Sequence, residues 1–202
     1  MISRHLVIDV EIQHNVDEFP DGFNATDQLG VACAVSYDVD AGTWKLYDDT
    51  AQDLRSLRHD LLAARRITGY NIWKFDLPVI WGTPNPVMQL YDKCDDLLQR
   101  IWAGSRLNPT VYSRATHGGF SLDAVCVATL GEKKIGHGAD APEHYKQKRW
   151  GKLFTYCMRD VWLTYQLADH AKNHNYVNAR GRRCHVDEFF IGQIESWQDQ
   201  KW

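Results

Sequence analysis

The sequence predicts an α/β domain built on a central mixed β-sheet with helices on its faces. A strand-like run and a β-hairpin pattern come first, and helical and strand-like patterns then alternate along the chain. The first run, LVIDVEI at residues 6–12, is apolar apart from two acids, as in a strand that is covered on both faces and lies centrally. Of the 202 residues, 44% are hydrophobic, so the chain can fill one core.

The N-terminal third is expected to form three strands and a helix. A polar, turn-rich loop follows the first strand, and VDAG separates two further strand-like segments as the turn of a hairpin. Leucines at helical spacing follow Thr50, which is a suitable N-cap residue. The expected elements are a strand at 4–10, a hairpin of 29–38 and 43–49 turning at 40–42, and a helix at 50–66.

The rest of the chain is predicted to be mainly helical. Pro78 suits the first turns of a helix, while Ser121 and Gly131 suit the start and stop of another. The expected elements are a strand at 67–71, a helix beginning near 72, a strand near 87–91, helices at 94–102, 121–131 and 152–174, and a closing hairpin that turns at ARGR.

Composition narrows the class of protein. A net charge of −3 argues against a protein that coats DNA through bulk positive charge, but not against an enzyme with a local nucleic-acid site. The five cysteines are widely spaced and include no CxxC pair, so a reducing, cytoplasmic environment is expected. The N-terminus lacks a signal-peptide pattern and no apolar run approaches the ~20 residues that span a bilayer, so no membrane association is expected.

Four acids stand in apolar surroundings in three separate segments. Asp9 and Glu11 project to the same face of the first strand, where two carboxylates repel each other unless a positive charge lies between them. Asp76 follows Phe75, and Asp160 lies in the long helix. These acids are compatible if they converge on hard divalent cations such as Mg²⁺ or Mn²⁺. Two such ions about 4 Å apart can support in-line displacement at phosphorus.

The three segments resemble the signatures of a known superfamily. DVE in the first strand, NIWKFD in the middle and YCMRD near the end are similar to the motifs of the DEDD 3′–5′ exonucleases, which include the proofreading domains of DNA polymerases. Tyr156 stands four residues before the last acid, as in the tyrosine branch, and Thr155 occupies the position five before it, where the other branch has His. SLDAVCVATLGEKK and the C-terminal hairpin extend the resemblance over about residues 4–190, toward stand-alone relatives of the B-family polymerase exonuclease domain.

The resemblance implies a fold, a boundary and a metal site. The fold would be a ribonuclease H-like sheet flanked by helices with a C-terminal β-hairpin, spanning residues 1–190 and followed by a tail at 191–202. Tyr156 would orient the attacking water, because a phenol with a pKa near ~10 is a poor base at neutral pH. The ligands of two Mg²⁺ or Mn²⁺ ions would be Asp9, Glu11, Asp76 and Asp160.

The resemblance also implies a substrate. It would be the 3′ end of a single-stranded nucleic acid, with DNA favoured over RNA, and the products would be nucleoside 5′-monophosphates. A protein partner acting in trans is compatible with this activity. The expected substrate contacts are Ile12, Gln13, Asn71, Phe75 and Lys134.

Each motif alone also has an ordinary structural interpretation. Two acids at a strand end can face solvent, Asp76 can sit in a helix first turn, and Tyr156 can simply hydrogen-bond to Asp160. Three such coincidences in the right order are improbable together. Two rival functions stay open: a catalytically silent module that binds nucleic acid or protein, and a two-metal endonuclease on the same fold.

Overall fold

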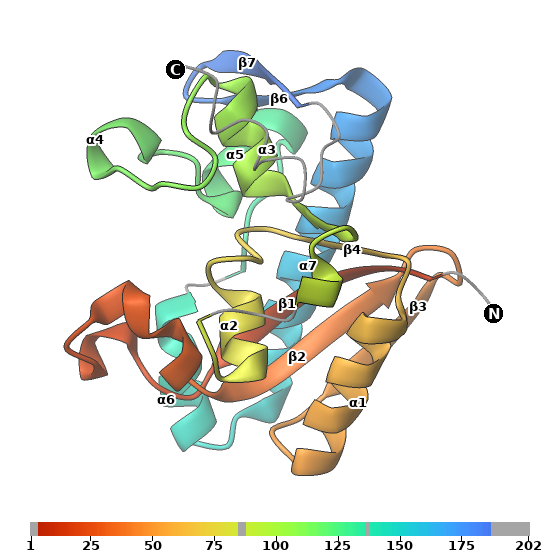
Figure 1. Cartoon of the computed structure of the whole chain (residues 1–202), viewed down its shortest axis with the longest axis vertical. Coiled ribbons are helices and arrows are strands. Elements are labelled where there is room, and N and C mark those ends of the chain that lie inside the picture. Colours follow the sequence, from red (N-terminus) through yellow and green to blue (C-terminus); the bar gives the residue numbers. More distant parts are fainter. Residues whose placement is uncertain (1–3, 85–87, 136–137, 187–202) are drawn as a thin grey trace.

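The protein forms a five-stranded mixed sheet and a separate two-stranded hairpin (Figure 1). The computed structural model describes residues 4–84, 88–135 and 138–186. β1 is the central strand, antiparallel to β2 and parallel to β4, which confirms the predicted fold class. The sheet order is β3 (Thr43–Tyr47), β2 (Val31–Asp38), β1 (His5–Ile12), β4 (Arg66–Gly69) and β5 (Cys94–Asp96).

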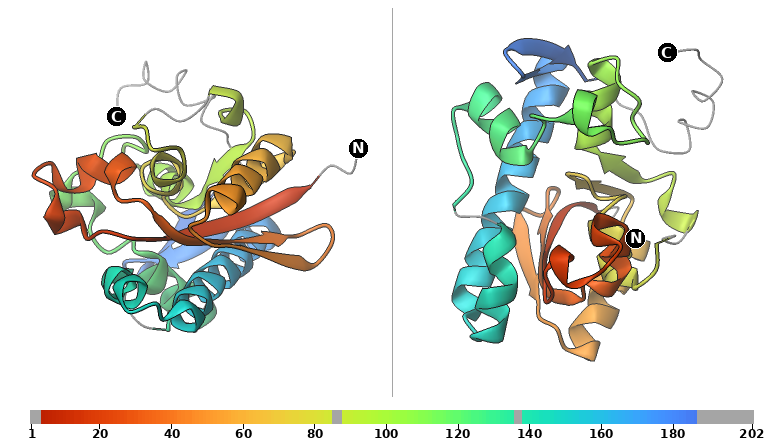
Figure 2. Two further views of the ribbon diagram at one scale, coloured as in Figure 1. Left: turned by 90° about the horizontal axis from the view of Figure 1, so that it is seen from below. Right: turned by 90° about the vertical axis from the view of Figure 1, so that its left-hand side faces the viewer.

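Helices cover both faces of the sheet because β1 is apolar on both sides (Figure 2). One face, with Ile8 and Val10, packs against α1 (Ala51–Ala63) and α2 (Asp76–Trp81). The other face, with Val7, packs against α6 (Ala141–Lys146) and α7 (Trp150–His174). Asp9 and Glu11 share the face of Val7, so their carboxylates lie between the sheet and α7.

A second group of elements packs around the C-terminal half of α7, beside the sheet (Figure 1). We call this part, residues 97–130 and 165–186, the hairpin lobe. Its core joins residues such as Trp102, Val125 and Leu167. Its other elements are α3 (Leu97–Gly104), α4 (Arg114–His117), α5 (Leu122–Leu130), β6 (Tyr176–Ala179) and β7 (Arg182–His185).

Side-chain caps set several helix boundaries where the sequence predicts them. The Thr50 hydroxyl accepts a hydrogen bond from the Asp53 amide at the start of α1, and Ser121 does the same for Ala124 in α5. Such caps are typically worth about 1 kcal/mol each. Gly131 ends α5 in the left-handed conformation with φ 72°, which glycine adopts without strain.

The strand predicted near residues 87–91 is wrong. Met88–Leu90 is a 3-10 turn (η3), and the strand lies at Cys94–Asp96, where the sequence predicted the start of a helix. The helix begins only at Leu97 because the Asp96 side chain caps it, accepting hydrogen bonds from the Leu98 and Gln99 amides. The three strand residues are too few to show a periodic pattern.

Short helices also occur where only loops were expected. They are η1 (Val16–Glu18) and η2 (Gly22–Gln28) after β1, α4, η4 (Gly138–Asp140) and α6.

The five cysteines are buried free thiols. No helix in the described part of the chain is long and apolar enough to cross a membrane. The predicted boundary between domain and tail, at residue 190, lies outside the described residues.

Candidate active site

The end of β1 is open on one side. β1 pairs with β2 from Leu6 to Ile12, but it pairs with β4 only from His5 to Val7. Beyond Val7 the chain of β4 turns away through Tyr70 and Asn71, and a pocket opens beside Asp9 and Glu11. The site therefore forms where one neighbour of the central strand stops and the other continues.

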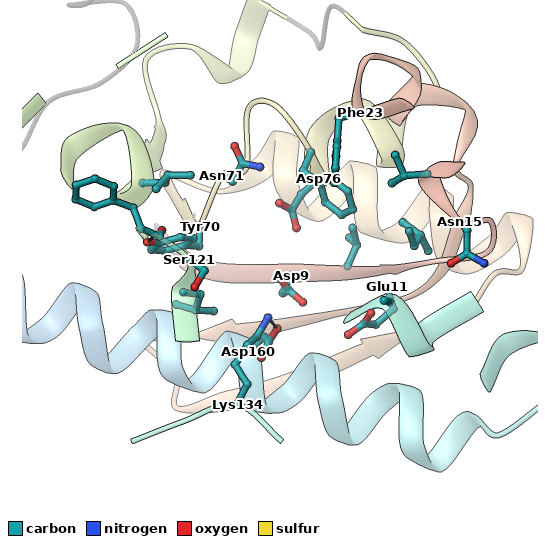
Figure 3. Close-up of a pocket in the computed structure, with 18 of the residues that line it drawn as sticks. Asp9, Glu11, Asn15, Phe23, Tyr70, Asn71, Asp76, Ser121, Lys134 and Asp160 are labelled. Carbon is teal, nitrogen blue, oxygen red and sulfur yellow. Dashed lines mark hydrogen bonds and ion pairs between the residues drawn. The ribbon is translucent and has the colours of Figure 1, made fainter. Parts of the chain in front are cut away.

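Three carboxylates meet at this opening. One oxygen each of Asp9, Glu11 and Asp160 lies within 4.8 Å of the others (Figure 3). α7 brings Asp160 to the strand because its preceding turn packs on β1, where the Cys157 thiol donates to the Asp9 carbonyl at 3.1 Å. The i, i+2 spacing on a strand and the seating of one helix thus suffice to gather three acids.

Asp76 approaches the same pocket from the opposite side of β1. Figure 3 shows its carboxylate above the strand, with Asp9, Glu11 and Asp160 below. Asp76 is 2% exposed, and its Oδ1 has no hydrogen-bond partner among the residues that the structure describes. A buried carboxylate oxygen without a donor is costly, so it is suited to receive a proton or a cation.

The turn before α2 explains how Asp76 reaches this position. Asn71 adopts a left-handed conformation with φ 64°, which asparagine tolerates. The carboxylate of Asp96 accepts hydrogen bonds from the amides of Asn71 at 2.9 Å and Trp73 at 3.2 Å. Burial raises the pKa of Asp96 to about 7. Asp96 was not identified from the sequence, where DDLL gives no signal beyond that of a helix start.

Burial and mutual repulsion disfavour ionisation of the gathered acids. Burial raises the pKa of Glu11 to about 8, with added repulsion from Asp160. Burial raises the pKa of Asp76 to about 8 as well. The pKa of Asp9 lies well above its usual range because the pocket walls exclude water and Asp160, Asp76 and Glu11 repel its charge. A proton or a metal cation bound at the site would therefore stabilise the cluster.

Lys134 supplies one positive charge. Its ammonium pairs with Oδ2 of Asp160, and its amide donates to Asp123 Oδ1 at 2.8 Å, which fixes the chain at this point. Burial alone would lower the pKa of Lys134, but Asp160 and Asp9 raise it, so the side chain stays charged. One ammonium faces four carboxylates, and a large excess of acid is left.

The donor set fits hard divalent cations. Every candidate ligand is a carboxylate oxygen, and the oxygens of three of them converge. Mg²⁺ and Mn²⁺ prefer such ligands, whereas thiolate and imidazole groups, which favour zinc, do not belong to the cluster. The unpartnered Oδ1 of Asp76 agrees with this need for a cation.

The pocket is large enough for a nucleotide, with a volume of about 610 Å³. Of the expected substrate contacts, Ile12, Asn71, Phe75 and Lys134 line it. Phe23, which the sequence analysis missed, also lines it and is 74% exposed. An aromatic residue in the polar loop after the first strand was the available signal.

Gln13 does not point into the pocket. Its side-chain amide donates to the Val31 carbonyl at 2.7 Å. Simple alternation would place Gln13 beside Glu11, but the register of β1 with β2 shifts between Glu11 and Ile12. The unpaired residue of this irregularity is Ala32 of β2, and β1 ends at Ile12, so the alternation of the strand does not extend to Gln13.

Tyr156 lies one helical turn before Asp160, outside the set of residues that line the pocket. It is half-buried, and its ring centroid is 5.6 Å from that of His144 in α6. Because α6 was not expected from the sequence, neither was this contact.

Comparisons with known proteins support the fold alone. No protein-family model matches the sequence, and no curated protein matches it. Among solved structures, the chain is similar to the family B DNA polymerase from the hyperthermophilic archaeon Pyrobaculum calidifontis, with a TM-score of 0.57 and 19% identity. The similarity covers 85% of this chain and 25% of the polymerase, so the chain spans about a quarter of its neighbour's length.

Proposed function

We propose that the protein is a Mg²⁺- or Mn²⁺-dependent 3′–5′ exonuclease acting on single-stranded nucleic acid, preferably DNA. The observation that carries the proposal is the convergence of Asp9, Glu11 and Asp160 within 4.8 Å, with Asp76 in the same pocket. The structural similarity to a DNA polymerase and the motif resemblance agree with a nucleic-acid substrate. The expected products are nucleoside 5′-monophosphates.

Asp9, Glu11, Asp76 and Asp160 would hold two divalent cations. When bound, these ions supply Lewis-acid stabilisation to the attacking and leaving oxygens of the phosphodiester. Burial and mutual repulsion disfavour the ionised carboxylates, and a bound cation would offset both effects.

The remaining pocket residues would position the strand. Phe23, Phe75 and Ile12 offer apolar surface against which the terminal base can stack or wedge. The Lys134 ammonium stands beside the carboxylates, where it can neutralise a phosphate oxygen. Tyr156 would orient the water by its hydroxyl, from its position one helical turn before Asp160 on α7.

An end-labelled oligonucleotide tests the proposal. Single-stranded DNA labelled at its 5′ end should give a ladder that shortens from the 3′ end in Mn²⁺ or Mg²⁺, and the ladder should vanish with a chelator. Asp160→Asn should abolish the ladder, whereas Asp92→Asn, which alters an exposed acid, should not. A circular single strand should stay intact; its cleavage would show an endonuclease instead. An Asp160→Asn protein as active as wild type would overturn the assignment.

A catalytically silent nucleic-acid-binding module is the second candidate. The pairing of Lys134 with Asp160 favours it, because an ammonium already neutralises part of the acidic cluster. Binding of the labelled oligonucleotide without cleavage at any Mn²⁺ concentration would support this candidate.

A further inference from the structure

The hairpin lobe carries an unusual charge for this acidic chain. It contains seven Lys and Arg residues and two Asp and Glu residues, whereas the whole chain has a net charge of −3. Arg100 is buried and bound to Asp95. The other six basic side chains are exposed, and none forms an ion pair with a carboxylate in the part of the chain that the structure describes: Arg106, Arg114, Lys172, Arg180, Arg182 and Arg183.

Arg180 connects this basic surface to the pocket. It stands at the tip of the β6–β7 hairpin with φ 52°, followed by Gly181 with φ 73°. Its side chain reaches back across the lobe, where Nη1 donates to the Thr116 carbonyl at 2.9 Å. Gly119 permits this approach, since a Cβ there would lie 3.3 Å from Arg180 Cγ.

The same guanidinium lies over the ring of Phe120, 5.6 Å from its centroid. Phe120 and the next residue, Ser121, line the pocket that holds the acids. Arg180 therefore stands directly behind one wall of the pocket, on the side of the hairpin lobe. Arg182 and Arg183 begin β7 and are both exposed; their side chains leave opposite faces of the strand, and the Arg183 guanidinium lies 4.4 Å from the centroid of the Tyr176 ring.

We propose that the exposed arginines of the hairpin lobe bind the phosphates of the substrate strand beyond the pocket. This inference rests on the proposed function and adds the path of the strand: from the acids, past Phe120, onto Arg180, Arg182 and Arg183. Guanidinium groups bind phosphates through paired hydrogen bonds, and such contacts position a strand without reading its bases. The negative site that cleaves and the positive surface that holds are separate parts of one chain.

The contribution of these arginines to substrate binding should depend on the length of the substrate. A strand long enough to reach the hairpin gains phosphate contacts, whereas a minimal substrate such as the p-nitrophenyl ester of thymidine 5′-monophosphate has no second phosphate to offer. Removing the arginines should therefore raise KM for long oligonucleotides and leave hydrolysis of the ester unchanged. Each lost phosphate contact should also reduce the slope of log affinity against log salt by about 1.

The variants are Arg180→Gln and the double variant Arg182→Gln/Arg183→Gln, with Arg180→Lys retaining charge. The matched control is Arg55→Gln/Arg65→Gln, which removes two exposed arginines from α1 and its C-terminal end. Melting curves establish that each variant folds. KM is measured across a salt series on long single-stranded DNA and RNA of matched sequence, and the ester is measured in parallel.

A rise in KM of several fold, with a reduced salt slope for the hairpin variants alone, is expected. Equal rises on DNA and RNA assign the contacts to phosphates, whereas an unchanged KM and salt slope would overturn the inference. If the wild type hydrolyses neither substrate, the proposed function fails by itself. Fluorescence anisotropy with the labelled oligonucleotides then decides the inference: loss of binding in the hairpin variants supports it, and unchanged binding overturns it.

Discussion

The pocket at the end of β1 and the hairpin lobe differ in charge, burial and origin. Glu11, Asp76 and Asp160 are each less than 10% exposed and come from three distant segments. The arginines of the hairpin are exposed and lie close together in the sequence. Catalysis at phosphorus requires groups that are held rigidly in a site that excludes water. Binding of a flexible strand requires charged side chains that are exposed to solvent. Under the proposed function, this difference would let a chain with a net charge of −3 act on a polyanion.

The largest expected effect comes from the acids. Asp9→Asn should lower the rate of 3′-end degradation by about 10²-fold or more, since it removes a convergent ligand while preserving shape. The same change should raise the melting temperature in chelator, because it relieves repulsion with Glu11 and Asp160. Gel assays measure the rate, and melting curves measure the stability. Equal activity of Asp9→Asn and the wild type would show that the acids of the pocket do not carry the chemistry.

The next effect is structural. Asp96→Ala removes the acceptor for the amides of Asn71, Trp73, Leu98 and Gln99. We expect a loss of about 1–3 kcal/mol in the free energy of unfolding, because buried donors lose their partner. Activity should fall in the folded fraction too, since the turn that places Asp76 loosens. A urea titration monitored by circular dichroism provides the number, and an unchanged midpoint would contradict the role assigned to Asp96.

The acids of the pocket, unlike the arginines of the hairpin lobe, should make the stability of the protein depend on pH. Because the pKa of Glu11 and of Asp76 is raised to about 8 in the folded protein, these groups bind protons more tightly folded than unfolded. Their contribution to stability is complete below their ordinary pKa values near 4 and is lost as the pH rises through about 8. In chelator the melting temperature should therefore fall from pH 5 to pH 8.5.

Mn²⁺ should reverse that fall, and the reversal should be larger at high pH, where the acids are ionised. Asp92→Asn, which alters an exposed acid, should behave as wild type in the same titration. A melting temperature that rises with pH in chelator would show that the buried acids are ionised without assistance.

The smallest effect should come from Phe23. Phe23→Ala should weaken oligonucleotide affinity by about 1 kcal/mol, as expected for loss of one base-stacking contact. Stability should be unchanged because the ring is 74% exposed. Unlike the hairpin variants, it should impair the p-nitrophenyl ester and long strands alike, since Phe23 lines the pocket itself. Impairment restricted to long strands would assign Phe23 to the path outside the pocket.

The strand and the helix that carry the acids follow from local patterns in the sequence, whereas the convergence of the acids was expected from their need for cations and from the motif resemblance. Alternation in LVIDVEI predicts a central strand with Asp9 and Glu11 on one face, and an apolar helical face carries Asp160 to it. These patterns depend on neighbours two to four residues apart. Such strand and helix patterns can therefore be recognised in the sequence without knowledge of tertiary contacts.

Features that depend on tertiary contacts could not be predicted in this way. β1 ends before Gln13, whose side chain donates to the Val31 carbonyl, and the unexpected helix α6 places His144 against Tyr156. The short strand at Cys94–Asp96 exists because its neighbour β4 pairs with it. Arg180 reaches the pocket wall only because the hairpin folds back onto Gly119.

The most direct test of the account is a calorimetric titration of Mn²⁺ into the wild-type protein and Asp9→Asn at pH 8. If the carboxylates form a divalent-cation site, Mn²⁺ should bind the wild type saturably, approaching two ions per chain, and bind the variant at least tenfold more weakly. Equal binding by the two proteins, or none by either, would contradict the claim that these carboxylates form a divalent-cation site.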